Sequence, residues 1–256
     1  ERAIEYWNGD EGKRGIVTLC WHCCPAARYD KSKNDPWGTF YTDKTKFNLA
    51  RAMNGRDPDG YQMLLDDIDA IAVQLKRLQD ADVPVLWRPL HEASGGWFWW
   101  GASGADAYLQ LYKLMYDRLT NVHGLNNLIW VWNGQDAAWY PGDEYVDIIG
   151  EDIYPGKHVY TSQAARFIKA LSYTDTRKLI TLSENGCIPD PEQLVRDNIM
   201  WSYWCVWEGE FVLKAAGFNN YSEQYTEKNM LKKAYKSDTV ITRKELPDLR
   251  NYPLGD

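Results

Sequence analysis

Two glutamates stand directly after apolar runs of the sequence, and glycines follow both. Glu92 lies in WRPLHEASGGWFWWG at 87–101, and Glu184 lies in LITLSENG at 179–186. If both runs are strands of one parallel barrel, the two carboxyl groups project at the same rim. Retaining cleavage of a glycosidic bond needs such a pair about 5 to 5.5 Å apart, one protonated to assist the leaving oxygen and one ionised to attack. We therefore predict that Glu92 and Glu184 form this catalytic pair. A structural role is the alternative, in which Glu92 merely pairs with Arg88.

Metal-dependent chemistry is the rival reading of the same region. His91 and Glu92 begin a metalloprotease motif, but Gly95 occupies the position of its second histidine. The cluster CWHCC at 20–24 contains Cys-x-x-Cys and a histidine, yet a closed zinc site there would need ligands from distant Cys187 or Cys205. We expect the five cysteines to be small apolar fillers at strand ends. No metal and no organic cofactor is expected.

Strands and helices that could position the two glutamates alternate along the chain. Six strands are predicted at 15–21, 83–91, 127–133, 146–154, 178–186 and 200–210. Helices are predicted from apolar residues recurring every three or four positions at 62–82, 105–120 and 161–171. Apolar strands separated by amphipathic helices predict a parallel sheet covered by helices, and a (β/α)8 barrel is the best candidate among such α/β folds.

A closed barrel of this type needs eight strands, whereas the pattern predicts six. The opening ERAIEYWNGDEG reads as the tail of a helix, with Gly9 as its terminator. We therefore expect residues 1–256 to form a single glycoside hydrolase catalytic domain that is incomplete at its N-terminus and lacks the first two strands. An open sheet, or two strands hidden from the pattern, is the alternative.

Composition restricts the partners. The chain has 29 Lys and Arg residues and 36 Asp and Glu residues, so its net charge is −7. A negative charge opposes binding to nucleic acid or to an anionic membrane surface. The chain has 13 Trp and 17 Tyr but only 6 Phe, an excess of rings with a flat apolar face and a polar edge. Such rings stack on sugars, although many must fill the core.

The stretch from Cys24 to about Asp59 is long and rich in turn-forming residues. It carries aromatic rings at Tyr29, Trp37, Phe40 and Tyr41. Because it follows the first predicted strand, it would rise from the C-terminal face of a barrel, where binding sites are built. We predict a binding loop, with a disordered linker as the alternative.

Several motifs, in order, resemble glycoside hydrolase family 26. They are RPLHE and GGWFWWG within 88–101, WVWN and YPGDEYVDIIGEDIY within 130–154, LSENG at 182–186 and WSYWCVWEGEF at 201–211. Characterised members are chiefly β-mannanases with a (β/α)8 barrel and a retaining mechanism. Histidine before the acid/base glutamate distinguishes this family from related barrels, and here that residue is His91. The chain departs from the family in having Ala93-Ser94 where methionine-asparagine is frequent, which puts fine substrate preference in doubt.

The resemblance implies a role for each motif residue. Glu92 would be the acid/base and Glu184 the nucleophile, with Tyr154 hydrogen-bonded to the nucleophile. Residues implied to contact sugar near the cleavage point are His22, His91, Trp97, Asp152 and Trp207, with Trp207 beneath the sugar ring. A packed, hydrogen-bonded structural role is the alternative for His22 and Asp152. Arg88 is expected to support Glu92 rather than to touch sugar.

We therefore expect an endo-β-1,4-mannanase that hydrolyses mannan, galactomannan or glucomannan by double displacement. The partners expected are β-mannan polysaccharide or manno-oligosaccharides, with no nucleic acid and no membrane, and the chain is expected to be a monomer. A glycanase of the same mechanism acting on β-glucan or xylan, or a non-catalytic polysaccharide-binding barrel, is the alternative. Because polymeric mannan cannot enter a cell, an extracellular or cell-surface location is expected.

Overall fold

The computed structural model describes residues 1–9, 14–25, 38–214 and 220–253. The chain forms two compact units. The central unit consists of Val17–Gly150 and Ser172–Lys178, and the terminal unit of Glu1–Ile16, Glu151–Leu171 and Leu179–Asp256. Strand β4 (Ile148–Ile153) contributes residues to both units.

Parallel strands form the core of the central unit. They are β1 (Val17–Trp21), β2 (Val85–Pro89), β3 (Leu128–Trp132) and the first half of β4. Val85 of β2 stands opposite Val17 of β1 and opposite Leu128 of β3, so neighbouring strands end near the same level. The side chains directly after these strands are therefore placed at one edge of the sheet.

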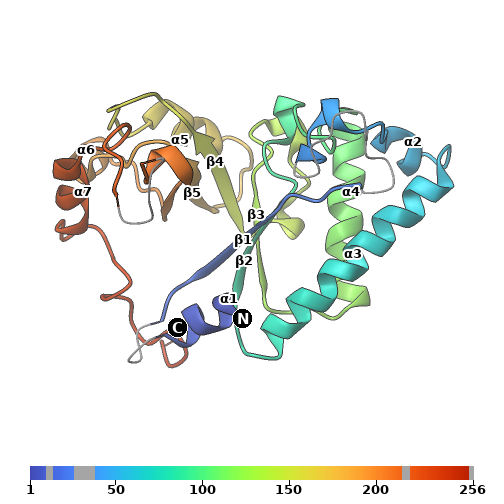
Figure 1. Cartoon of the computed structure of the whole chain (residues 1–256), viewed down its shortest axis with the longest axis horizontal. Coiled ribbons are helices and arrows are strands. Elements are labelled where there is room, and N and C mark those ends of the chain that lie inside the picture. Colours follow the sequence, from blue (N-terminus) through green and yellow to red (C-terminus); the bar gives the residue numbers. More distant parts are fainter. Residues whose placement is uncertain (10–13, 26–37, 215–219, 254–256) are drawn as a thin grey trace. The chain divides into compact units, whose positions relative to one another are not determined.

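Helices α2 (Leu49–Met53), α3 (Pro58–Gln79) and α4 (Ala105–Asp117) lie beside these strands in Figure 1. The sequence explains where α3 begins. Asp57 caps this helix by accepting from the Gly60 amide at 3.1 Å, and Pro58 follows at the first helical position. A π-helical turn, Arg118–Val122, continues α4. The apolar face predicted for 105–120 is buried, at Tyr108, Tyr112 and Met115 of α4 and at Leu119 of the π-helical turn.

The terminal unit contains the remaining regular elements. They are α1 (Arg2–Asn8), the second half of β4, α5 (Ala164–Leu171), β5 (Leu179–Asn185), α6 (Pro191–Asp197), β6 (Trp204–Val206) and α7 (Lys228–Tyr235). Strand β6 runs parallel to β5, and all six strands are hydrogen-bonded in the order of the sequence. Short 3-10 helices occur at Thr42–Lys44, Ala93–Gly95, Ala137–Trp139, Asp143–Tyr145 and Gly209–Phe211.

The structure confirms the six predicted strands and the α/β class. It also confirms that the first residues form a helix ending at Gly9, which adopts a φ of 75°. The apolar face predicted for 161–171 is wrong in part, because Ile168 and Leu171 of α5 are exposed and Ala170 is the buried residue. Helix α5 is short, and the neighbouring parts of the chain, rather than the spacing of its own apolar residues, decide which of its side chains are buried.

The predicted binding loop at 24–59 is not a continuous loop. Helix α2 and the 3-10 turn Thr42–Lys44 interrupt it. Tyr41 forms an antiparallel bridge with Phe98 and is partly exposed, whereas Tyr29 and Trp37 lie outside the described residues. Among the described residues, no helix combines the length and apolarity needed to cross a bilayer.

Candidate active site

Glu92 stands three residues after β2, where the backbone takes an unusual turn. Leu90 and Glu92 both have a φ of 52°, in the left-handed region that side chains with a Cβ rarely adopt. The Glu92 amide donates to the backbone oxygen of Asn133 at 2.7 Å. A backbone conformation of this kind costs free energy and persists only where the surrounding structure holds it, which is typical of functional sites. The Glu92 side chain on this turn is half-buried.

Asn133 holds this turn in place. It is fully buried directly after β3, and its Oδ1 accepts from the Glu92 amide at 3.3 Å and from Nη1 of the buried Arg88 at 3.1 Å. Its Nδ2 donates to the Gly150 oxygen of β4 at 2.8 Å. One amide side chain at the end of β3 therefore links the turn after β2 to the middle of β4. The expected support of Glu92 by Arg88 includes this path through Asn133.

Trp97 lies against Glu92. Its Nε1 donates to Oε2 of Glu92 at 3.0 Å, while 47% of the residue is exposed. The ring lies so close to Gly95 that a Cβ at that position would stand 2.0 Å from it. Gly95 thus makes room for the tryptophan of its own turn, and the exposed ring remains available to a sugar.

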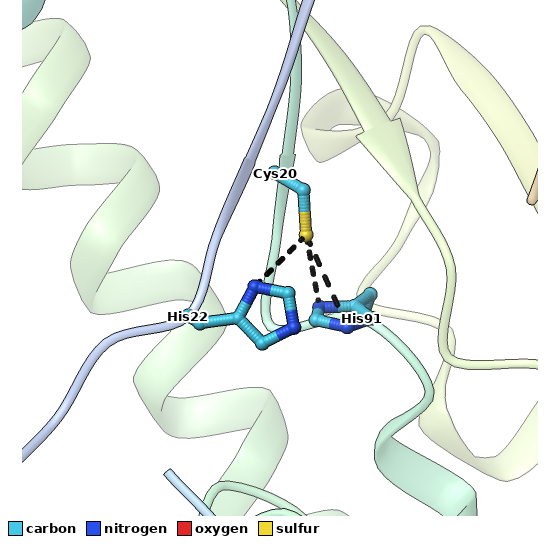
Figure 2. Close-up of side chains that lie close together, drawn as sticks. All are labelled: Cys20, His22 and His91. Carbon is cyan, nitrogen blue, oxygen red and sulfur yellow. Dashed lines mark hydrogen bonds between the residues drawn. The ribbon is translucent and has the colours of Figure 1, made fainter. Parts of the chain in front are cut away.

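His22 and His91 meet in the central unit, beside Cys20 (Figure 2). Their ring centroids are 4.5 Å apart in an edge-to-face arrangement, and Phe98 flanks both. Burial, together with the nearby charges of Arg88 and His22, holds the pKa of His91 well below its ordinary value of 6.5. His91 is therefore neutral at physiological pH and has one ring nitrogen free of a proton.

Glu184 lies within β5 and is buried. The hydroxyl of Tyr154, which directly follows β4, donates to its Oε2 at 2.6 Å. A hydrogen bond this short holds the Glu184 carboxyl group in one orientation. The hydrogen bond implied by the resemblance is thus present.

Asp152 and Trp207 are both hydrogen-bonded to β5 in the terminal unit. Asp152 is buried in β4, and its Oδ1 accepts from Ser183 Oγ of β5 at 2.6 Å. Trp207 follows β6, and its amide donates to the Asn185 oxygen of β5 at 3.0 Å. The hydrogen bond from Ser183 to Asp152 would also be expected if Asp152 had only a structural role. Contact between Asp152 and sugar therefore stays a prediction.

The structure divides the predicted site residues between the two units. His22, His91, Glu92 and Trp97 belong to the central unit, and Asp152, Tyr154, Glu184 and Trp207 belong to the terminal unit. Glu92 and Glu184 therefore come from different units, and their pairing stays a prediction. Sequence reasoning missed Asn133, although it directly follows a strand in a segment already singled out, WVWN, and it did not connect Cys20 of CWHCC with His91.

Comparison with known proteins places these motifs in a family. A model described as "Glycosyl hydrolase family 26" matches residues 1–245. The chain is 46% identical over 233 residues to a mannan endo-1,4-beta-mannosidase of Thermothelomyces thermophilus, covering 91% of this chain and 46% of that protein. It is 38% identical to mannan endo-1,4-beta-mannosidase A of Piromyces sp, covering 96% of this chain and 38% of that protein. The chain thus spans less than half the length of these curated relatives.

A solved structure shows the same likeness. A β-mannanase from a symbiotic protist of the termite Reticulitermes speratus, complexed with a gluco-manno-oligosaccharide, is 36% identical with a TM-score of 0.81. The match covers 96% of this chain and 72% of that one. A family model that matches nearly the whole chain, agreeing with the strand-end motifs, establishes that this chain belongs to glycosyl hydrolase family 26.

Proposed function

We propose that this chain carries the catalytic residues of a retaining endo-β-1,4-mannanase, with Glu92 as acid/base and Glu184 as nucleophile. The observation that carries the proposal is the contrast between the two carboxylates. Glu184 is buried in a strand and accepts a 2.6 Å hydrogen bond from Tyr154, while Glu92 is half-buried on a strained turn beside Trp97. A fixed, ionised group suits attack, and a less enclosed group suits exchange of protons with a leaving oxygen and with water.

In the first step Glu92 would give its proton to the glycosidic oxygen as the bond from that oxygen to the anomeric carbon breaks. A carboxylate oxygen of Glu184 would form a covalent bond to the same carbon from the opposite face. In the second step Glu92, now ionised, would take a proton from water as the water oxygen attacks the anomeric carbon and releases Glu184. Two inversions give net retention, and both glutamates return to their starting states.

The proposed substrate is β-1,4-linked mannan, including galactomannan and glucomannan. The names of the relatives, which are mannan endo-1,4-beta-mannosidases, support this choice. We propose that Trp207 stacks beneath the sugar at the cleavage point and that His22, His91, Trp97 and Asp152 contact it, because aromatic faces and neutral polar groups suit an uncharged sugar. We also propose that this activity lies outside the cell or at its surface, because a polymer of this size cannot enter a cell.

The (β/α)8 barrel belongs to this proposal. Six parallel strands hydrogen-bonded in sequence order support it, because neighbouring strands of such a barrel are consecutive in the chain. The two further strands that closure requires, a single catalytic domain and a monomeric state remain predictions.

Proton NMR of freshly released product tests the retaining mechanism. Cleavage of β-linked mannan by double displacement must release the β-anomer first, and mutarotation then produces the α-anomer. The α-anomer appearing first would refute the assignment of Glu184 as nucleophile.

Glu184→Ala tests the same residue independently. We expect turnover of mannan to be abolished while manno-oligosaccharide binding, measured by calorimetry, remains detectable. The matched control is Glu192→Ala on α6, whose side chain is 79% exposed and pairs with Lys233. Activity in Glu184→Ala equal to that of the control would discard the assignment.

Release of reducing sugar from galactomannan, xylan and mixed-linkage β-glucan distinguishes the proposed substrate from its alternatives. We expect galactomannan to be cut fastest. Cleavage of xylan or β-glucan alone would replace the mannan proposal with the same mechanism on another polymer. Binding without cleavage of any of them would indicate a polysaccharide-binding protein.

A further inference from the structure

Cys20, His22 and His91 bring one sulfur and two imidazole rings together in the central unit (Figure 2). The sulfur of Cys20 lies 3.3 Å from Nδ1 of His91 and 3.8 Å from Nδ1 of His22. One possible ligand atom from each residue lies within 4.8 Å of those of the other two. Two of the three residues come from the end of β1 and one from the turn after β2, so parallel pairing of these strands produces the cluster.

The separations match those around a tetrahedral zinc ion. With zinc–sulfur bonds of about 2.3 Å and zinc–nitrogen bonds of about 2.0 to 2.1 Å, a sulfur and a nitrogen on one ion stand roughly 3.6 Å apart. The observed 3.3 and 3.8 Å lie on either side of that value.

We propose that Cys20, His22 and His91 bind one zinc-class divalent cation, with a fourth coordination position left for water. The thiol of Cys20 would lose its proton to solvent as the Sγ–metal bond forms, because the thiolate is the ligand. Cys20 and His22 are only half-buried, so an ion from solvent can approach. Cys23, which completes the Cys-x-x-Cys motif, is buried and does not belong to this cluster.

Binding requires one movement. The sulfur is 3.3 Å from Nδ1 of His91 and 3.9 Å from Nε2, so it lies across the ring and not along the lone pair of either nitrogen. The His91 imidazole must therefore turn about its Cβ–Cγ bond before a nitrogen points at the ion. That turn would take His91 away from sugar, so the cation should inhibit hydrolysis, a consequence that rests on the proposed function.

Cobalt(II) is the probe of choice, because a thiolate ligand gives it an intense near-ultraviolet charge-transfer band. We expect the chelator-treated protein to bind one equivalent with this band, and zinc(II) to displace it. Cys20→Ser should abolish the band and weaken zinc binding by at least about 100-fold, since removing even an outer partner of a ligand costs about 10- to 100-fold. Cys24→Ser is the matched control, a half-buried cysteine in the same segment, and should retain both.

No charge-transfer band in the parent protein, or its survival in Cys20→Ser, would overturn the proposed site. Because this measurement needs no turnover, it separates failure of the metal site from failure of the proposed activity. Zinc inhibition is then measured relative to the metal-free activity of each variant. Inhibition that persists equally in Cys20→Ser would show that zinc acts elsewhere and would overturn the inhibitory consequence.

Discussion

Tyr154 is the residue whose single hydrogen bond bears most directly on the proposed nucleophile. Its hydroxyl contacts Oε2 of Glu184 at 2.6 Å, and 42% of the residue is exposed, so its ring is not a core filler. Gly186 keeps the space beside it open, because a Cβ there would stand 3.3 Å from the Tyr154 ring. The hydroxyl therefore acts on Glu184 with little effect on packing.

Tyr154→Phe should lower kcat/KM for mannan about 10- to 100-fold, because a hydrogen bond to a charged group contributes roughly 1.5 to 3 kcal/mol. The melting temperature should change little. Tyr225→Phe is the matched control, since it removes a hydroxyl that donates to the carboxylate of Glu210 at 3.1 Å on the surface of the same unit. Equal activity of the two variants would show that Tyr154 does not assist Glu184.

At the scale of elements, one buried amide at the end of β3 connects two neighbouring strands. Asn133 joins the turn after β2 to β4 through the hydrogen bonds of its side chain. Parallel strands bring their carboxyl ends to one level, but this pairing does not fix the conformation of the loops that follow. A buried polar side chain whose hydrogen bonds are all made by those loops does fix it.

Asn133→Ala should destabilise the protein by at least about 2 kcal/mol, because it leaves buried partners of Asn133 unsatisfied. It should also reduce turnover by more than the loss of folded protein explains, because the turn that holds Glu92 is released. Asn127→Ala is the control: its Nδ2 donates to the Val83 oxygen at 2.9 Å at the opposite end of β3. Urea unfolding and kcat are measured for both, and equal kcat values would contradict a positioning role.

At the scale of the whole molecule, stability should fall in acid. Hydrogen bonds from Arg118 foremost, and from His123, lower the pKa of Asp69 from 3.8 to about 2. Hydrogen bonds from Thr174, Thr176 and Tyr140 lower the pKa of Asp143 to about 2. A carboxylate with a depressed pKa stabilises the folded state above its unfolded pKa, and that contribution is lost as the pH falls through the folded pKa.

We therefore expect the free energy of unfolding to decline between about pH 4 and pH 2. Asp69→Asn should be less stable than the parent at pH 6, and the difference should shrink toward pH 2. Asp80→Asn, which removes an exposed charge paired with Lys76, should differ from the parent by less than about 1 kcal/mol at any pH. A constant difference between Asp69→Asn and the parent across this range would contradict the linkage.

Sequence periodicity was sufficient for the elements that depend on local burial. Six strands, the helices α3, α4 and α5 and the helix ending at Gly9 were predictable, because apolar spacing and glycine terminators act within a few residues. Helices α2, α6 and α7 were missed, since they are short and their apolar residues give no sustained rhythm. The exposure of Ile168 and Leu171 likewise depends on neighbours from elsewhere in the chain.

The candidate residues themselves were determined by the sequence, because their types and their places after apolar runs are local facts: Glu92, Glu184, and the histidines and tryptophans around them. Only the tertiary structure decided their contacts. The pairing of β1 with β2 brings His91, rather than Cys187 or Cys205, to the CWHCC segment. The pairing of β2 with β3 brings Asn133 to the turn that carries Glu92. Such contacts join residues distant in the chain, and strand register, which no local pattern encodes, decides which of them meet.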